Sequence, residues 1–409
     1  MARWRVYIKP FDVNGNYVSE YIEITRDVAS LGSPKQGIDN TEFDVGVIKN
    51  SGFNITLRND HGHYSGVTEL QSIFRYTRKN SLLKITWDFR DRGLICGFFQ
   101  CGREPLGGEY VVFEGLINEV TSSSDIQAQQ ATFACLGFDS LLQEIAAPYS
   151  SINNGDSFST ILYAMLNQAP FTDLVTVSLS NITPSTNIAI DDKTTLENKT
   201  VGQVLKPLLL AANSVLFIKD GIVYVTGRDE SSTNMFTFYG QASRSNENII
   251  SIPKFRDGMN RVFNMWTWED VPSVYSRDLT SIAQYGQLSK QMKLEIISDA
   301  STSKIQTILD ANKTEFAYPK IELDLETPIW YDVLGLEILD KVNIDYPTIY
   351  ISFDGGPLPR YDQGFLYDGT ARYPHEQWAL TLSTETYFKI MAKKIDVKKQ
   401  TITFSLRET

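Results

Sequence analysis

Two histidines, His61 and His63, flank a glycine and are close enough in sequence to bind one metal ion together. Imidazole nitrogens ligate transition metals, and three copies of the chain meeting on an axis could bring six rings around one ion. The pair follows Asn59 and Asp60, however, and small polar residues beside glycine are typical of a tight turn. We therefore interpret the segment as a turn and predict no metal site, with His61 and His63 as the only candidate ligands.

No catalytic or cofactor-binding motif stands out in the rest of the sequence. One further histidine is present, His375, and there is no serine-nucleophile elbow, HExxH helix, phosphate-binding loop or dinucleotide-binding turn. Carboxylates are plentiful, but no pair differs from a solvated surface. Asp354 and Asp368 stand beside glycines without the spacing of a calcium loop. The sequence thus predicts no catalytic residue, no cofactor and no enzymatic activity.

The three cysteines form neither an even framework nor a closely spaced pair of metal ligands. Cys135 lies in an alternating run and is expected to be a buried apolar filler. Cys96 and Cys101 could form a disulfide across a loop under oxidising conditions, and the sequence leaves that pairing open.

The bulk composition limits the partners that the protein can have. The chain has 409 residues, enough for two to four domains, and a formal net charge of −11. Because no basic block is present, stable nucleic-acid binding is not expected, although an acidic wall that DNA slides past is compatible. The N-terminus has no apolar signal-peptide core, and the most apolar run, 208–218, is far shorter than the roughly 20 residues of a membrane helix. We expect synthesis in a cytoplasm and no stable membrane insertion.

Residues 1–147 carry the pattern of a β domain. Apolar and polar residues alternate in short runs, as they do in half-buried strands, and Gly115 suits a bulge or bend. Asp139 is then expected to cap a short helix that Pro148 ends. The predicted strands span 4–9, 21–25, 53–57, 82–87, 111–120 and 130–138.

Residues 148–228 have the pattern of a small α+β domain. Asp156 is predicted to cap a first helix, and Thr200 a second one that Pro207 should kink or start late. A strand is predicted at 174–179, and a hairpin at 214–219 and 222–226 around the Asp220-Gly221 turn.

The C-terminal half is predicted to return to β structure. Residues 229–318 mix strands with one helix at 298–312, and residues 319–409 carry strands at 320–325, 334–345 and twice within 387–406. The segment 354–378 is rich in glycine, tyrosine, aspartate and proline without periodicity, so we interpret it as an exposed loop inserted in the last domain. The whole pattern predicts an α+β, mostly β, multidomain fold.

Several of these segments, taken in order, resemble the tail hub and tail-tip proteins of bacteriophages. Residues 53–65 resemble the family's strand that ends in an Asn-Asp-x-Gly turn, and 82–88, 113–120 and 131–142 follow in the family's order and spacing. Farther on, 200–229 is similar to its helix–hairpin element and 276–315 to its Tyr-Gly segment followed by a helix. The chain departs from the family by having His-Gly-His-Tyr in place of the usual Gly-Arg-Phe, and by its long loop at 354–378.

The resemblance implies a structural protein of the virion tail tip, made in the host bacterial cytoplasm. Two β-barrel-like hub domains per chain, 1–147 and 319–409, would form a pseudo-sixfold collar in a homotrimeric ring, with the smaller domains 148–228 and 229–318 between them. A distal tail protein or the tail tube would lie above the ring and a tail fibre or spike below it. Viral DNA would pass through without specific binding.

Two other functions are alternatives at this stage. A hexameric distal-tail ring protein is disfavoured by the length of the chain and by its second β domain. A carbohydrate- or receptor-binding module would use the aromatic loop at 354–378, although the same side chains pack equally well against a neighbouring subunit. A glycan hydrolase is least favoured, because it needs a paired-carboxylate cleft.

Overall fold

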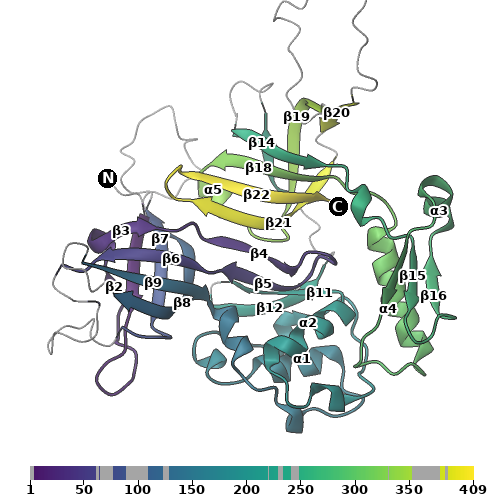
Figure 1. Ribbon diagram of the computed structural model, residues 1–409, viewed down its shortest axis with the longest axis horizontal. Coiled ribbons are helices and arrows are strands. Elements are labelled where there is room, and N and C mark those ends of the chain that lie inside the picture. The colour runs from purple at the N-terminus through teal and green to yellow at the C-terminus, as the bar shows by residue number, and fades with distance from the viewer. Residues whose placement is uncertain are drawn as a thin grey trace, which may run out of the picture.

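The structure, a computed structural model, describes residues 4–60, 64, 77–88, 109–122, 129–219, 221–228, 234–240, 248–329, 331–351, 378–382 and 386–409. Three β-sheets of seven, twelve and three strands carry most of the described chain, and helices pack beside them (Figure 1). The predicted fold class, α+β and mostly β, is confirmed. No helix in these ranges is long and apolar enough to cross a membrane. His61, His63, His375, Cys96, Cys101 and nearly all of the predicted loop at 354–378 lie outside the described residues.

The first sheet has seven antiparallel strands in the order β2-β1-β7-β8-β9-β6-β3. β6 shows the predicted alternation, with Phe53, Ile55 and Leu57 buried and the residues between them more exposed. At Gly115 in β8, a Cβ atom would come within 2.6 Å of the Phe113 ring. The ring lies so close to the backbone here that only glycine leaves room for it. The strands are β1 (Trp4–Lys9), β2 (Ile22–Glu23), β3 (Val28–Leu31), β6 (Phe53–Arg58), β7 (Leu82–Asp88), β8 (Glu109–Ser122) and β9 (Gln130–Gly137).

Two predictions at the edges of this sheet need correction. The strand predicted at 21–25 is only two residues long, because the 3₁₀ helix η1 (Thr25–Asp27) begins at its end. Asp139 does not cap the helix after β9. Gly137 holds the cap position of η3 (Phe138–Gln143), and the buried Asp139 accepts the backbone N–H of Asn50 at 3.4 Å. Burial raises the pKa of Asp139 to about 6.

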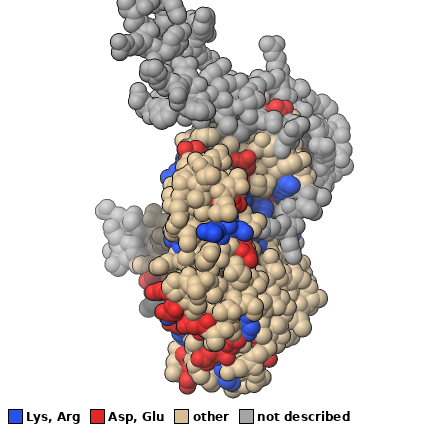
Figure 2. Space-filling view, turned by 90° about the vertical axis from the view of Figure 1, so that its right-hand side faces the viewer, with Lys and Arg blue, Asp and Glu red and all other residues tan. Residues whose placement is uncertain are grey.

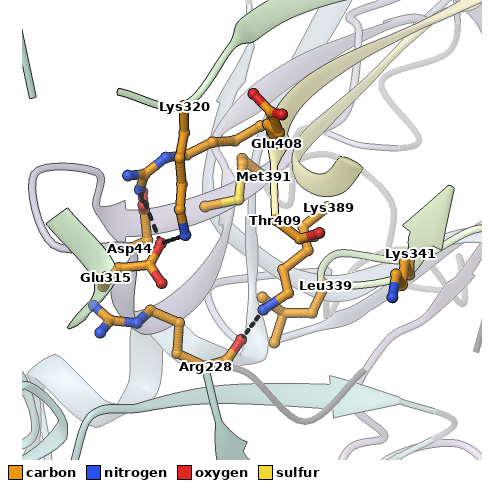
Figure 3. A pocket seen from close by; sticks show the side chains of 11 residues that line it. Asp44, Arg228, Glu315, Lys320, Leu339, Lys341, Lys389, Met391, Glu408 and Thr409 are labelled. Carbon is orange, nitrogen blue, oxygen red and sulfur yellow. Dashed lines mark hydrogen bonds and ion pairs between the residues drawn. The ribbon is translucent and has the colours of Figure 1, made fainter. Parts of the chain in front are cut away.

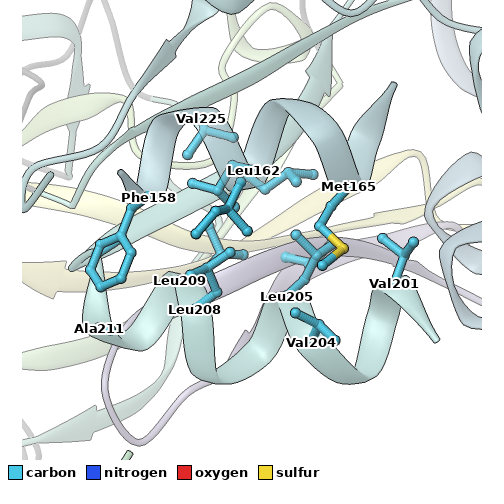
Figure 4. Packing of buried hydrophobic residues seen from close by; sticks show 14 of the residues in the cluster. Phe158, Leu162, Met165, Val201, Val204, Leu205, Leu208, Leu209, Ala211 and Val225 are labelled. Atoms are coloured by element: carbon cyan, nitrogen blue, oxygen red, sulfur yellow. The ribbon is translucent and has the colours of Figure 1, made fainter. Parts of the chain in front are cut away.

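The helices α1 (Phe158–Leu166) and α2 (Val201–Ala211) pack together through their apolar faces. Leu162 and Met165 of α1 lie toward Leu205 and Leu208 of α2 (Figure 4). Pro207 lies inside α2, which nevertheless continues to Ala211. The predicted hairpin is confirmed as β11 (Ser214–Lys219) and β12 (Ile222–Gly227).

The first helix is capped one residue later than predicted. Ser157 holds the cap position of α1, and its hydroxyl accepts the N–H of Thr160 at 3.4 Å. The Asp156 carboxylate instead turns back to the N–H of Asn153 at 2.7 Å. A nearby backbone donor therefore occupies the carboxylate, and the next hydroxyl takes over the cap.

The strand predicted at 174–179 is wrong. Two 3₁₀ helices, η5 (Phe171–Asp173) and η6 (Leu179–Asn181), enclose this segment. Only Thr176 forms a bridge, to Ile222, so the extended stretch is too short to be a strand. The short strand of this region is β10 (Ile182–Thr183), which pairs with β12 in parallel.

Thr200 begins α2 as predicted, and it does so through a capping box. Its hydroxyl accepts the N–H of Gln203 at 3.4 Å, and its own N–H donates to Oε1 of Gln203 at 3.0 Å. We expect Thr200→Ala to lower the free energy of unfolding by about 1 kcal/mol, because the helix loses one capped donor. Urea denaturation followed by circular dichroism measures this change. Thr200→Ser keeps the hydroxyl and should cost clearly less; an equal loss in both variants would rule out the cap as the cause.

The three-stranded sheet forms a separate unit with α4 (Thr302–Phe316), visible on the right of Figure 1. Its strands are β15 (Met265–Trp268), β16 (Tyr275–Arg277) and β17 (Ser289–Met292), and α3 (Leu279–Tyr285) follows β16. The helix predicted at 298–312 is α4, which begins and ends about four residues later. Ile305, Ile308 and Leu309 are buried on one side of this helix.

The twelve-stranded sheet connects segments that are far apart in the sequence. Its main order is β10-β12-β11-β5-β4-β21-β22-β18-β14, with β13, β19 and β20 attached beside β21. Strands from all four predicted domains thus share one sheet, and the division into domains itself stays a prediction. The remaining strands are β4 (Lys35–Asn40), β5 (Val45–Ser51), β13 (Asn234–Tyr239), β14 (Ser251–Arg256), β18 (Glu322–Pro328), β19 (Lys341–Ile351), β20 (Trp378–Leu382), β21 (Tyr387–Asp396) and β22 (Thr401–Glu408).

Near the C-terminus, the prediction of a strand at 334–345 is correct only for its second part. The two strands within 387–406 are confirmed as β21 and β22. Of the strand predicted at 334–345, only the second part lies in β19. Leu334 ends the short helix α5 (Tyr331–Leu334), and a loop follows. Leu336 and Ile338 lie in that loop, and both are buried. Their alternating apolar side chains resemble a strand in sequence, but here they only fill the core.

Candidate functional site

Side-chain contacts hold together the two ends of the predicted histidine turn. Asn59 accepts the backbone N–H of Tyr64 at 2.9 Å, and the buried Tyr64 donates its hydroxyl to Asp27. His61 and His63 lie outside the described residues, so the absence of a metal there stays a prediction. Within the described ranges, no three His, Cys, Asp or Glu side chains are grouped as a metal site requires. Cys135 is buried as predicted, and burial raises the pKa of its thiol.

Asp44 is the centre of a buried ionic junction at the turn between β4 and β5. Its side chain accepts from Nη2 of Arg261 at 2.8 Å and is paired with Nη1 of Arg407. Arg261 also binds Glu322 at 2.7 Å, and Arg407 lies 3.7 Å from Glu315. Asp44 is only 3% exposed, and burial lowers the pKa of the Arg407 guanidinium to about 10, which leaves it charged at neutral pH. The junction is therefore an alternating series of opposite charges.

The Phe316 ring, at the end of α4, lies among three guanidinium groups. Its centroid is 5.0 Å from Cζ of Arg407, 5.4 Å from Cζ of Arg228 and 5.6 Å from Cζ of Arg261. The ring is fully buried, and the ring of Trp266 packs against it at 5.9 Å. Cations lying near a buried aromatic ring are attracted by its quadrupole, so Phe316 gives the three arginines a common contact.

The junction takes residues from all four predicted segments. Asp44 comes from 1–147 and Arg228 from 148–228, while Arg261 and Phe316 come from 229–318 and Arg407 from 319–409. Arg228 also donates to the Phe43 carbonyl at 2.8 Å. Because each contact needs a particular geometry, these segments are held in one relative orientation at this point.

A pocket of about 200 Å³ opens beside the junction (Figure 3). Two of its lysines have partners: Lys320 binds Glu315 at 2.7 Å, and Lys389 donates to the Arg228 carbonyl at 2.6 Å. The only hydroxyl side chain on its described lining is Thr409, which donates to a backbone carbonyl at 3.4 Å. The pocket therefore offers no nucleophile beside a general base, and its geometry fits structure or binding better than reaction.

A second hollow, of about 500 Å³, lies on the twelve-stranded sheet and shares Asp44, Arg261 and Arg407 with the junction. We call it the groove. Its charged lining alternates with buried apolar residues along the strands, as β18 shows: Glu322 and Asp324 are half-buried, and Leu323 and Leu325 point into the core. The charged side chains of the groove are Lys35, Asp39, Asp44, Lys49, Lys254, Arg256, Arg261, Glu322, Asp324 and Arg407.

A buried lysine lies on the core side of the same sheet. Lys393 in β21 donates to the carbonyls of Leu334 at 2.6 Å and Leu336 at 2.9 Å. Burial lowers the pKa of Lys393 to about 8, and the Glu337 and Asp340 carboxylates oppose that shift. Lys219 pairs with Glu337 at 3.1 Å, and the Tyr110 ring lies 6.0 Å from Lys393.

The lowered pKa of Lys393 predicts a pH dependence of stability. Between about pH 8 and the unfolded-chain value near 10.4, the unfolded chain binds more protons than the folded one, so stability should rise with pH. We expect the stability of the natural chain relative to Lys393→Met to rise by about 1 kcal/mol per pH unit in this window. Urea denaturation at several pH values measures it, and Lys394→Met, at an exposed neighbour, is the matched control. A difference that is flat with pH would contradict the prediction.

Little in the amino-acid sequence indicates the junction. Asp44, Arg261 and Arg407 stand singly among ordinary surface charges, and the bonded residues Asp44 and Arg261 are 217 positions apart in the sequence. The one available signal was the outward position of Arg407 in the alternating strand β22, where its neighbours Phe404 and Leu406 point into the core.

No protein-family model and no curated protein matches the chain. Its fold is similar to that of several solved tail proteins. One, a tail protein from Neisseria meningitidis MC58, has a TM-score of 0.53 at 12% identity and covers 99% of this chain and 96% of its own. The 43 kDa tail protein of prophage MuSo2 from Shewanella oneidensis has a TM-score of 0.52 at 10% identity, covering 98% and 97%. A prophage tail protein from Listeria monocytogenes EGD-e has a TM-score of 0.51 at 8% identity, covering 98% and 94%. At these identities the likeness shows a shared fold.

Proposed function

We propose that the chain is a structural subunit of a phage tail and forms the central hub of the tail tip. The observation that supports this most is the likeness of the whole fold to tail proteins, because each of the three matches covers at least 94% of either chain. A fold alone does not determine a function. The collinear motifs at 53–65, 113–120 and 131–142 point to the same family independently.

The ionic junction suits this role. A hub must keep its parts in one orientation while the proteins above and below it exert force. Buried charge pairs can specify one arrangement, because any other arrangement leaves a charge without its partner. Asp44, Arg261, Arg407 and Phe316 hold several segments of the chain together in this way.

In the proposed assembly, three copies form a ring in the virion. The distal tail protein or tail tube lies above it, a fibre or spike lies below it, and the viral DNA passes through without specific binding. The net charge of −11 supports passage rather than binding, because it repels the phosphate backbone. The protein acts by assembly and has no catalytic role.

Native mass spectrometry of the purified chain, with negative-stain images of any ring, tests the proposal. We expect a trimer. A hexamer would favour the distal-tail ring protein instead, because a closed sixfold ring matches the tail tube directly. A chain that stays monomeric at high micromolar concentration would overturn the self-assembling ring.

A further inference from the structure

The groove is a trough with small residues on its floor and charges on its walls. Gly37, Ala392 and Ser405 lie on three neighbouring strands, β4, β21 and β22. The strands approach closely here, since a Cβ atom on Gly37 would lie 3.3 Å from the Cβ of Ala392. Lys35 stands on one side, and Lys254 and Arg256 stand on the other. Three strands separate these two walls, which places them roughly 19 Å apart at about 4.8 Å per strand.

The cations of the groove outnumber its carboxylates, six to four, in a chain whose net charge is −11. Three of the cations are already held: Arg261 and Arg407 by Asp44, and Lys49 by Asp39 at 3.2 Å. For the other three, Lys35, Lys254 and Arg256, the described chain provides no ion-pair partner. Cross-strand neighbours do not satisfy them either. Lys254 stands opposite Asp324 and Arg256 opposite Glu322 in the ladder, yet neither pair is bonded.

The lining favours a protein ligand over a nucleic acid. Single-stranded nucleic acids bind to grooves that combine cations with aromatic platforms, and none of the described residues that line the groove is aromatic. Asp39 and Asp324 would also repel phosphates along the trough. A surface with both signs of charge and an excess of cations fits a protein surface in which carboxylates predominate.

The chain itself carries such a surface on its three-stranded unit. Glu269 and Asp270 follow β15, and Glu295 and Asp299 lie between β17 and α4; all four are exposed. Hydrogen bonds join the two segments, from Glu269 N–H to the Met292 carbonyl at 3.0 Å and from Trp268 Nε1 to Asp299 at 2.8 Å. Two of them have a lysine beside them: Asp270 pairs with Lys293, and Glu295 lies 3.6 Å from Lys199. We call these four carboxylates the acidic corner.

The acidic corner and the groove are separate surfaces of the chain. The groove contains Arg261, which precedes β15, whereas Glu269 and Asp270 of the acidic corner follow the other end of that strand and do not line the groove. On the face that includes this unit, acidic side chains gather in the lower part and basic ones across the middle (Figure 2). Two complementary patches at different places on one chain are what a head-to-tail contact between copies needs, and such contacts form a ring when the rotation between subunits closes.

We propose that the groove receives the acidic corner of a second copy of this chain, and that this contact joins neighbouring subunits. Carboxylates of the corner would bind Lys254 and Arg256 on one wall and Lys35 on the other. The inference rests on the proposed ring and names the surfaces that form it.

Charge reversal on both surfaces tests the inference. Lys254→Glu with Arg256→Glu should raise the concentration at which the oligomer dissociates by about tenfold or more, and Glu269→Lys with Asp270→Lys should do the same. All four substitutions in one chain should restore assembly, because the contact then forms with its charges exchanged. Native mass spectrometry and sedimentation over a dilution series give the readout. The matched control is Lys398→Glu with Lys399→Glu, in the exposed turn between β21 and β22, which changes the net charge equally.

The outcomes separate the two proposals. Restoration by the combined variant supports the contact. An oligomer that survives both reversals overturns the contact and leaves the ring standing. An equal loss of assembly in the control would show a general charge effect and also overturn the contact. A natural chain that is monomeric throughout overturns the ring and the contact together.

Discussion

Asp44→Asn is expected to lower the free energy of unfolding by about 3–5 kcal/mol. The substitution keeps the size of the side chain and removes only its charge, so the half-buried guanidinium of Arg261 and the buried one of Arg407 lose their common carboxylate. Arg407 is 4% exposed and has little access to water that could replace the lost partner. The amide would also direct an N–H group toward one of these cations, which cannot accept it.

The measurement is urea denaturation followed by tryptophan fluorescence. Trp266 lies 5.9 Å from Phe316 and should report on the junction directly. The matched control is Glu144→Gln, which removes an equally short pair with Lys79 on the surface, where the two side chains are 53% and 51% exposed. The control should cost less than about 1 kcal/mol, because water solvates whichever charge is left. Similar losses in the two variants would show that the junction does not stabilise the fold.

Elements of the fold could be predicted from the sequence where residues close together in the chain determine them. The alternation in β6 and the hairpin of β11 and β12 were predicted correctly, because residues next to each other in sequence decide them. Thr200 was predicted correctly as a cap for the same reason. Asp156 was not, because Asn153 offered its carboxylate a competing donor.

Contacts between distant segments could not be predicted in this way. No strand was predicted at β4 or β5, where glycines and charges interrupt the apolar pattern. These two strands nevertheless join the N-terminal segment to β11 and β21. Their polar side faces the groove. The glycine and charged residues that interrupt the apolar pattern, such as Gly37, Lys35 and Lys49, are therefore residues that line the proposed binding surface.

The candidate site also depends on contacts between distant segments. Each charge of the junction would be solvated in an isolated segment, and the junction forms only where Phe316 of α4 meets Arg407 of β22 and Asp44. Phe316 looks like an ordinary core position at the end of an amphipathic helix. Its role as the common contact of three arginines depends on chain segments that periodicity does not relate to one another.

The second large effect is expected at Gly258, the residue that positions Arg261. Gly258 has φ +71° and precedes the short 3₁₀ helix η8 (Met259–Arg261), whose last N–H donates to the Gly258 carbonyl at 3.0 Å. A Cβ atom here would lie 1.9 Å from the Lys320 carbonyl oxygen, which is backbone and cannot turn away. Gly258→Ala should therefore combine left-handed strain with a forced shift of the chain, at a cost of about 2–4 kcal/mol.

Gly221 separates these two causes, because it has nearly the same φ, +72°, and no atom within 4 Å of the position of a Cβ atom. Gly221→Ala should cost only the backbone term, about 1 kcal/mol. Urea denaturation of both variants gives the difference. If the close approach to Lys320 matters as we expect, Gly258→Ala should also disturb Trp266 fluorescence in the folded protein, because the shift would draw Arg261 away from Asp44 and Phe316. Equal costs in the two variants would mean that the chain around Lys320 yields easily, and that the junction tolerates movement of one of its arginines.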